Sequence, residues 1–275
     1  MKKVPLINEV SRYNKVKYPL FKCIKCGFCR PNPLPFEDHS EIEFYDNGEH
    51  IKFFDKDLKD INRETREYNY YYKHFKPFLK FIRKYNMSGK SLDIGCGPGH
   101  LMELEKKEGI KVEGMEVSKI LVNLLSKKGF KMHYGLLGKV KLAKYDIITM
   151  NQVLEHIEHP EYAIKEINKA LKKKGYCIIA VPYLYGIIPQ ILRSKWYGLG
   201  YGQHLNFFSK KSIKIVLERN GFETREIKIL SVDYAHPKFP FFINWIANLI
   251  MQINILLGIG DNLFIVAQKM KESKK

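Results

Sequence analysis

The chain has 275 residues and a mass of 32.3 kDa, with 45 % hydrophobic and 13 % aromatic residues. This length and composition exclude wholesale disorder and predict one large domain with an appendage, or two small domains. The 47 lysine and arginine residues outnumber the 29 acidic residues, and the net charge of +18 favours an anionic partner such as nucleic acid or a membrane surface. Only 8 of the basic residues are arginine, however, and lysines scattered along a chain are typical of a solvated surface. A nucleic-acid partner is therefore an alternative and not the favoured one.

The N-terminal residues give no sign of export. The stretch between Lys3 and Glu9 is too short and too soon charged for a secretory signal. The sequence also lacks a wholly apolar run of about 18 residues, which excludes an ordinary polytopic membrane protein. We therefore expect a cytoplasmic location.

Three segments follow one another along the chain. Residues 1–45 contain several prolines and three closely spaced cysteines, and we expect them to be irregular. Residues 46–90 form a helical lead-in, whose pattern extends from Asp57 to Tyr85 and which Pro77 is expected to divide into two helices. Residues 91–275 alternate between strand and helix patterns and form the main domain.

Short strand-like runs and amphipathic runs alternate in the main domain. Strands are predicted at 91–94, 111–117, 131–134, 145–150, 176–181, 222–230 and 262–268. Helices are predicted at 99–107, 118–128, 160–173 and 209–220, with Ser118 and Ser209 as N-caps and Gly175 as the cap after the third helix. Repeated strand–helix units with right-handed crossovers predict an α/β fold with a doubly wound, parallel sheet.

A glycine-rich turn follows the first of these strands. The sequence Leu92-Asp93-Ile94-Gly95-Cys96-Gly97-Pro98-Gly99-His100 ends a strand in a Gly-x-Gly-x-Gly turn that opens a helix. Small residues allow the backbone to approach a ligand, and the helix N-terminus offers unpaired N–H groups. A dinucleotide loop would place its third glycine one residue later. The Asp93 carboxylate would repel a pyrophosphate but accept a cationic ligand, which weighs against NAD.

This turn resembles the cofactor loop of class I S-adenosylmethionine (SAM)-dependent methyltransferases, and the resemblance extends from about Ser91 to Gln268. It implies a Rossmann-like, mostly parallel sheet with an antiparallel last strand. It also implies that SAM contacts the loop, the acidic end of the second strand, which would hold both ribose hydroxyls, and the loop after the fourth strand. The residues expected to bind SAM are Asp93, Gly95, Cys96, Gly97, Gly99, Glu116, Val117, Asn151 and Gln152. For Glu116, a role as a helix-start carboxylate is the structural alternative.

Two features of the family pattern are altered in this chain. Many relatives carry an acidic residue near the adenine amino group, whereas the stretch here reads Gly135-Leu136-Leu137-Gly138. We therefore expect backbone groups and the two leucines to hold the adenine. Some quinone-type O-methyltransferases carry two glutamates and a histidine, linked to a metal or base role, where this chain has Gln152, Glu155 and His156.

Two histidines are the candidate catalytic residues. His156 lies beside the cofactor loop, at the carboxyl end of the sheet, where ligands bind in such folds. His204 belongs to a segment, Gly202-Gln203-His204-Leu205-Asn206-Phe207-Phe208-Ser209, that resembles the His-x-x-x-Phe-Ser segment of one branch of the family. Either ring could take a proton from an acceptor hydroxyl. Hydrogen bonding at a helix start and simple packing are the structural alternatives for His156 and His204 respectively.

The three N-terminal cysteines raise the question of a metal. Cys23, Cys26 and Cys29 resemble the second half of a small zinc ribbon found ahead of some of these methyltransferases, but the upstream cysteine pair is absent. With His39 as the fourth ligand they could bind zinc, because a closed structural site needs four ligands. A vestigial ribbon without metal is the alternative. Cys96 and Cys177 are expected to be packed residues.

The segment from Phe239 to Gly260 has no charged residue, and its polar residues recur every fourth position. We expect a buried helix or a dimer contact, with a lipid-binding or peripheral-membrane helix as the alternative. The resulting hypothesis is a methyltransferase acting on a small or lipid-linked metabolite, such as a sugar, quinone or isoprenoid-type acceptor. An RNA methyltransferase and a non-catalytic SAM-binding module are the alternatives.

Overall fold

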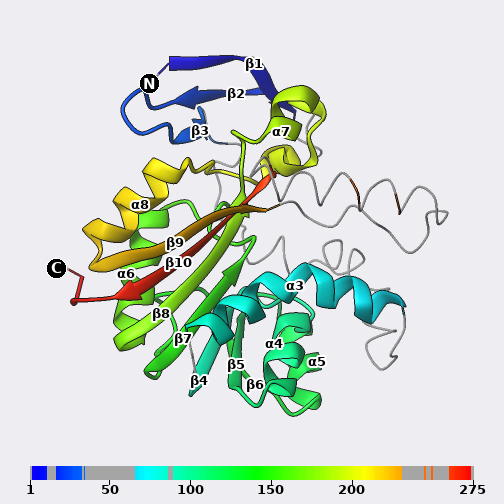
Figure 1. The fold of residues 1–275 in the computed structure, drawn as a ribbon, viewed down its shortest axis with the longest axis vertical. Helices are drawn as coiled ribbons and strands as arrows, with labels where there is room; N and C mark the ends of the chain where they lie inside the picture. Colours follow the sequence, from blue (N-terminus) through cyan, green and yellow to red (C-terminus); the bar gives the residue numbers. More distant parts are fainter. Residues whose placement is uncertain are drawn as a thin grey trace.

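A computed structural model describes residues 2–10, 17–32, 34, 66–85, 89–230, 245, 249 and 260–273. The predicted α/β fold is confirmed (Figure 1). Seven strands form one sheet in the order β6-β5-β4-β7-β8-β10-β9. The strands are β4 (Lys90–Ile94), β5 (Lys111–Glu116), β6 (Lys131–Tyr134), β7 (Tyr145–Asn151), β8 (Leu171–Pro182), β9 (Phe222–Leu230) and β10 (Asn262–Lys269).

The chain direction within the sheet also agrees with the expectation. Strands β4, β5, β6, β7 and β8 pair in parallel. The last strand, β10, pairs antiparallel with both β8 and β9. The order of the strands changes direction beside β4, so the loops after β4 and β7 diverge there and leave room for a ligand.

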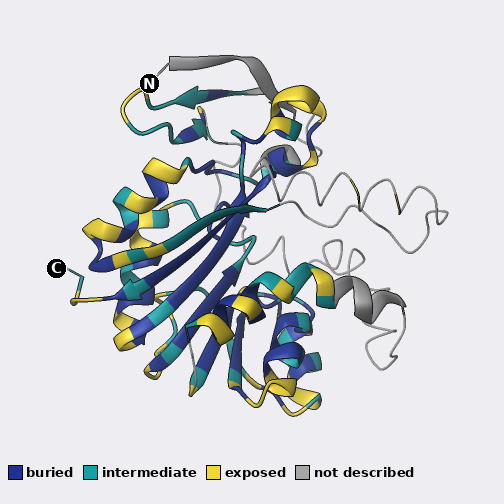
Figure 2. Cartoon of the chain, in the orientation of Figure 1, coloured by how far each residue is buried: buried dark blue, intermediate teal, exposed yellow. Residues whose placement is uncertain are grey.

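Helices cover both faces of the sheet (Figures 1 and 2). The α-helices are α3 (Arg66–Lys84) in the lead-in, and α4 (His100–Lys107), α5 (Lys119–Lys127), α6 (Pro160–Ala170), α7 (Ile187–Leu192) and α8 (Lys210–Arg219) in the main domain. Alternate residues of each strand contribute to different cores. Ile148 packs with α6 and α8, whereas Ile147 packs with α3 and α4. In the described part of the chain, no helix has both the length and the apolarity needed to cross a bilayer.

The prediction that Pro77 would divide the lead-in into two helices is wrong, because α3 continues through it. Proline removes one backbone hydrogen bond, but the apolar face of the helix is held by tertiary packing. Phe78 and Ile82 are buried against the sheet, and the ring centroid of Phe78 lies 5.3 Å from that of Phe264. Residues 57–65 of the predicted helix lie outside the described residues.

The boundary between α6 and β8 also differs from the prediction. Helix α6 ends at Ala170 and β8 begins at once with Leu171, so Gly175 lies within the strand and does not cap the helix. A Cβ at Gly175 would lie 3.0 Å from the carbonyl oxygens of Asp146 and Lys172. This close backbone approach explains the glycine without a helix end.

The two predicted serine caps have different outcomes. Ser209 Oγ accepts from the backbone N–H of Ser212 at 3.0 Å, and Ser212 Oγ accepts in return from the N–H of Ser209 at 2.9 Å. Ser118 precedes α5 but makes no side-chain cap bond. Instead, its backbone N–H donates to the Glu116 carboxylate at 3.0 Å. The predicted start of α5 is confirmed, but the prediction that the Ser118 side chain caps it is wrong.

The N-terminal segment is more regular than expected. Its described residues form a three-stranded antiparallel sheet of β1 (Lys2–Val10), β2 (Lys17–Lys22) and β3 (Cys29–Pro31). Leu20 and Cys29 of this sheet pack against Trp196 and Phe207 of the main domain. Backbone bonds of 2.9 Å join Cys29 and Phe207 in both directions. The small sheet therefore rests on the segment that follows β8, which contains α7 and the short 3₁₀ helices η1 (Arg193–Lys195) and η2 (Tyr197–Gly202).

Candidate active site

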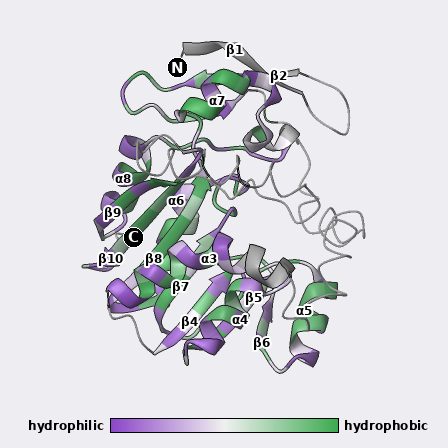
Figure 3. Cartoon of the chain, turned by 45° about the vertical axis from the view of Figure 1, so that its right-hand side comes forward, coloured by the Kyte–Doolittle hydropathy of each residue, from purple (hydrophilic) through white to green (hydrophobic). Residues whose placement is uncertain are grey.

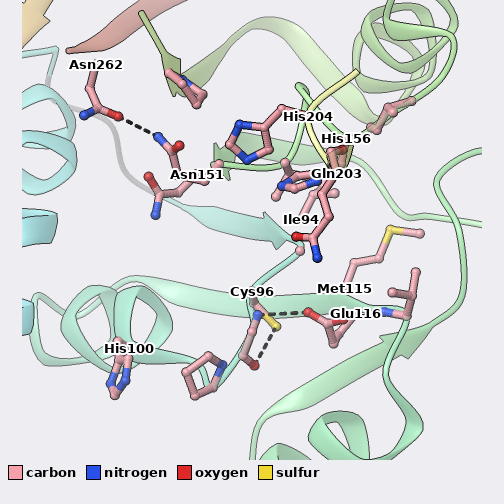
Figure 4. A pocket seen from close by; sticks show the side chains of 18 of the residues that line it. Ile94, Cys96, His100, Met115, Glu116, Asn151, His156, Gln203, His204 and Asn262 are labelled. Carbon is pink, nitrogen blue, oxygen red and sulfur yellow. Dashed lines mark hydrogen bonds between the residues drawn. The ribbon is translucent and has the colours of Figure 1, made fainter. Parts of the chain in front are cut away.

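A cavity of about 570 Å³ lies at the carboxyl ends of β4, β5 and β7 (Figure 4). The glycine loop and the end of β5 form one part of its wall, and the segment around η2 forms another. Of the residues expected to bind cofactor or to act in catalysis, those that line it are Gly95, Cys96, Gly97, Glu116, Val117, Asn151, Gln152, His156 and His204. The fold therefore brings together residues that are more than 100 positions apart in the chain.

The backbone of the glycine loop explains its composition. Gly95, Gly97 and Gly99 have φ values of 65°, 52° and 85°, a region that side chains rarely adopt. A Cβ at Gly95 would lie 2.5 Å from a methyl group of Val153. A Cβ at Gly99 would lie 2.6 Å from Leu125. Gly99 therefore permits close packing of the helix that follows, and it does not line the cavity.

Glu116 joins the end of β5 to the glycine loop. Its carboxylate accepts three backbone hydrogen bonds, from Gly97 at 2.9 Å, Val117 at 2.8 Å and Ser118 at 3.0 Å. Only 7 % of the residue is exposed, and the exposed part faces the cavity. The carboxylate is thus both a support of the loop and an acceptor available to a ligand, because each oxygen has more than one lone-pair direction.

Asp93 has a different place from the one expected. It is 3 % exposed and does not line the cavity. Its carboxylate accepts from the hydroxyl of Thr149 at 2.7 Å, and burial raises its pKa to about 7. Another buried carboxylate, that of Glu105, has its pKa raised to about 8 by burial and by the charge of Asp93. Asp93 is therefore buried beneath the glycine loop against Thr149, and its side chain is not placed to contact a ligand in the cavity.

A polar chain that the sequence did not indicate lies along the cavity wall. Gln152 has a positive φ of 55°, and its side-chain amide donates to Asn262 at 2.8 Å. Asn262 donates to the buried Asp261 at 3.1 Å, which also accepts from the Tyr197 hydroxyl at 2.5 Å. All four residues line the cavity. Leu136 and Leu137, which the sequence predicts to hold the adenine, line it as well.

The two candidate catalytic histidines lie in contact (Figure 4). Their ring centroids are 4.7 Å apart and the rings are nearly perpendicular. His156 Nδ1 lies 3.1 Å from the carbonyl oxygen of Gln203, and His204 Nδ1 lies 2.8 Å from that of Gly198. Because a carbonyl oxygen only accepts, each Nδ1 carries the proton, and in the neutral ring the lone pair is on Nε2. Burial lowers the pKa of His204 to about 4, so this ring is neutral at physiological pH.

Glu155 forms a group with both histidines. The sequence links Glu155 and His156 to a metal or base role, but it does not indicate that His204 joins them. The Glu155 carboxylate is fully buried, has no hydrogen-bond partner among the described residues, and has its pKa raised to about 8 by burial. One ligand atom from each of Glu155, His156 and His204 lies within 4.8 Å of the others. Two imidazole nitrogens and a carboxylate oxygen suit a divalent cation of the zinc type. These are the described residues that could hold a metal.

The cysteines do not form the predicted metal site. No group of three ligands that includes Cys23, Cys26 or Cys29 occurs within the described ranges. Backbone N–H groups of Lys25 and Cys26 lower the pKa of Cys23, whereas Cys29 is buried and its pKa is raised by burial. The Cys29 thiol lies 3.4 Å from the Tyr185 hydroxyl, inside the apolar cluster with Leu20. A zinc site at these three cysteines is therefore not supported, and His39, the fourth ligand suggested for it, lies outside the described residues.

The sequence also yields predictions for the two other cysteines and for the uncharged segment. Cys96 and Cys177 are buried, as expected, and burial raises the pKa of both thiols. Most of the segment from Phe239 to Gly260 lies outside the described residues. Its described side chains Trp245 and Leu249 are 59 % and 48 % exposed.

Comparison with known proteins agrees with this architecture. A family model described as a methyltransferase domain matches residues 63–227. A ubiquinone biosynthesis O-methyltransferase of Pelagibacter ubique is 27 % identical over 151 residues, which are 50 % of this chain and 63 % of that protein. The chain thus spans less than two thirds of this curated relative.

Solved structures with similar folds include a SAM-dependent methyltransferase from Archaeoglobus fulgidus, with a TM-score of 0.51 and 19 % identity, covering 74 % of this chain and 100 % of the other. A possible histamine N-methyltransferase from Thermotoga maritima has a TM-score of 0.54 and 19 % identity, covering 80 % and 99 %. At such identities these structures support the fold alone. The family match covers more than half of the chain and identifies it as a member of this methyltransferase family, whose SAM-dependent class I fold the chain has.

Proposed function

We propose that this chain transfers a methyl group from SAM to a hydroxyl of a small or lipid-linked acceptor. The observation that carries the proposal is the continuity of one cavity from the Glu116 carboxylate and the glycine loop to the His156–His204 pair. A nucleoside at the first part would leave the second part to the acceptor, so donor and acceptor would meet inside a single cavity.

The cofactor side has groups suited to SAM. Glu116 offers carboxylate oxygens for two vicinal hydroxyls, and Leu136 and Leu137 offer apolar surface to a flat base. Gly97 allows the backbone to approach the ligand. The bound donor supplies a methyl group already activated by the positive sulfonium, so the protein mainly aligns the acceptor and excludes water.

The acceptor side has a base. As the acceptor oxygen bonds to the methyl carbon, the carbon–sulfur bond breaks, and the hydroxyl proton must leave the oxygen. Both histidines have Nδ1 directed at a backbone carbonyl, which leaves the lone pair of each neutral ring on Nε2, so His156 or His204 can take this proton. Glu155 with both histidines would hold a divalent cation if one is bound, and such an ion lowers the pKa of a coordinated hydroxyl.

Support for the acceptor class comes from two sources. The acceptor side of the cavity includes Trp196, Tyr197 and the two histidine rings, which suit an apolar or aromatic molecule. The Pelagibacter ubique relative is named an O-methyltransferase of ubiquinone biosynthesis. These similarities favour a small or lipid-linked acceptor over a polynucleotide.

The experiment that tests this proposal is transfer of labelled methyl from SAM into a cell extract separated into lipid, small-molecule, protein and RNA fractions. We expect label in the lipid or small-molecule fraction, and its loss with Glu116→Gln. Label confined to RNA would replace the proposal by an RNA methyltransferase. Binding of SAM with no transfer to any fraction would favour a non-catalytic SAM-binding module.

A further inference from the structure

Two apolar tips lie at the end of the molecule that carries the N-terminal sheet. The turn between β2 and β3 exposes Ile24, of which 69 % is accessible, and α7 exposes Ile191, of which 71 % is accessible. These are the most exposed large hydrophobic side chains among the described residues. Figures 1 and 3 show the N-terminal sheet and α7 at the same end, beyond the carboxyl edge of the large sheet.

Helix α7 has more than one apolar side chain in solvent. Ile187 is 47 % exposed and lies four residues before Ile191, so these two side chains are neighbours on one face of the helix. Leu192, at the end of the helix, is 42 % exposed. Figure 2 shows exposed residues along α7, and Figure 3 shows that this helix is largely hydrophobic. Large aliphatic side chains that are this exposed and lie next to one another indicate an interaction surface.

Positive charge accompanies both tips. Lys25 follows Ile24 and is exposed, and Arg193 and Lys195 follow α7 directly and are exposed. Neither residues 17–32 nor residues 186–204 contain an aspartate or glutamate. An anionic bilayer surface attracts a protein surface of this kind. The apolar side chains can enter the interface, while the neighbouring cations bind the anionic headgroups.

We propose that this end of the molecule, the β2–β3 turn together with α7 and η1, docks on an anionic membrane surface. Tyr197 links this surface to the candidate active site, because it follows η1 after one residue, lines the cavity and is 46 % exposed. Docking would place the cavity near the headgroups, where a lipid-linked acceptor resides. This last consequence rests on the proposed function, whereas membrane docking itself does not require methyl transfer.

The test is co-sedimentation of the full chain with extruded vesicles of phosphatidylcholine, with and without phosphatidylglycerol. We expect binding to the anionic vesicles, little binding to the neutral ones, and release as salt is raised. Ile191→Ser should lower the partition coefficient about tenfold, and Ile24→Ser by a similar factor. Lys195→Ala should lower it about fivefold.

Matched controls separate docking by this surface from general attraction of a basic protein. Ile120 is 47 % exposed on α5, and Lys127 is exposed on the same helix, so Ile120→Ser and Lys127→Ala make the same chemical changes elsewhere. Both controls should bind as the unaltered chain does. Absence of binding to anionic vesicles would overturn the proposal. Equal losses from Lys127→Ala and Lys195→Ala would overturn it as well, as would conversion of a dimer to a monomer by Ile191→Ser without any vesicle binding.

Discussion

Replacement of Glu116 by glutamine tests the cofactor site most sharply. The two side chains have the same shape, so the variant keeps the packing and changes only the acceptor pattern. In the structure one carboxylate oxygen accepts from Val117 and Ser118, and the other accepts from Gly97 at 2.9 Å. In the variant, the amide nitrogen of glutamine would replace one of the two oxygens and could not accept a hydrogen bond. If it faces Gly97, one hydrogen bond is lost, whereas two are lost if it faces Val117 and Ser118, so we expect it to face Gly97.

The size of the effect follows from that contact. A buried donor left without an acceptor costs about 1–3 kcal/mol, and the ligand loses an anionic acceptor as well. We expect the dissociation constant for SAM to rise about 10- to 100-fold, which corresponds to roughly 1.4–2.8 kcal/mol. The free energy of unfolding should fall by about 1 kcal/mol through the lost support of the Gly97 N–H.

Isothermal titration calorimetry with S-adenosylhomocysteine, the non-reactive product, measures this change. Glu161→Gln is the matched control, because Glu161 is exposed in the first turn of α6 and far along the chain from the glycine loop. The control should bind as the unaltered chain does. A folded Glu116→Gln chain whose dissociation constant stays within about twofold would refute the assignment of this carboxylate to the cofactor site.

Three further variants test other parts of the account. Asp93→Asn should weaken SAM binding by less than about fivefold, because the amide oxygen can still accept from Thr149 beneath the loop; a loss as large as that of Glu116→Gln, by calorimetry, would contradict the indirect role. His204→Asn should lower kcat by about 10²- to 10⁴-fold with SAM binding preserved, and an unchanged kcat would remove this ring as the base. Burial raises the pKa of Glu105 to about 8, so the folded chain keeps a proton between about pH 4.5 and 8 that the unfolded chain releases, and stability falls as pH rises through that window. Glu105→Gln should therefore stabilise the chain at pH 8 more than at pH 5.5 in urea unfolding, and an equal effect at both pH values would show that Glu105 is not held neutral.

The sequence predicts the main domain well because its local signals and its burial agree. The alternation of strands and helices, the glycine turn and the acidic end of β5 are all local patterns, and the fold keeps each one. Glu116 is predicted as a cofactor residue from the resemblance to the family's second strand, and its carboxylate accepts a hydrogen bond from Gly97 in the glycine loop. Local patterns of this kind predict the structure correctly because residue propensity, hydrophobic periodicity and turn chemistry all favour the same fold.

Features that depend on contacts between distant residues could not be predicted in this way. Proline in α3 is tolerated because Phe78 and its neighbours are buried by the sheet, which no local rule reveals. Cys29 resembles a metal ligand in sequence, yet Phe207 and Leu20 enclose it in an apolar cluster. Strands β2 and β3 have only six and three residues and rest on the main domain, so their own residues carry little strand signal.

In the candidate site, too, local features could be predicted from the sequence, whereas contacts between distant residues could not. The position of each histidine was predicted from its own segment, but their contact arises because the segment after η2 folds back over the end of β7. The backbone carbonyl of Glu155 accepts from Leu205 at 2.8 Å and from Asn206 at 3.0 Å, which fixes that return. Asp93 was expected at the ligand because it precedes the turn, but the strand pleat directs its side chain to Thr149 instead.

A crystal structure of the chain with S-adenosylhomocysteine tests the central claim most directly. The account predicts the ribose hydroxyls within hydrogen-bond distance of the Glu116 carboxylate, the base against Leu136 and Leu137, and the sulfur directed toward the His156–His204 pair. A nucleoside bound outside this cavity, or bound within it without contact to Glu116, would contradict the account.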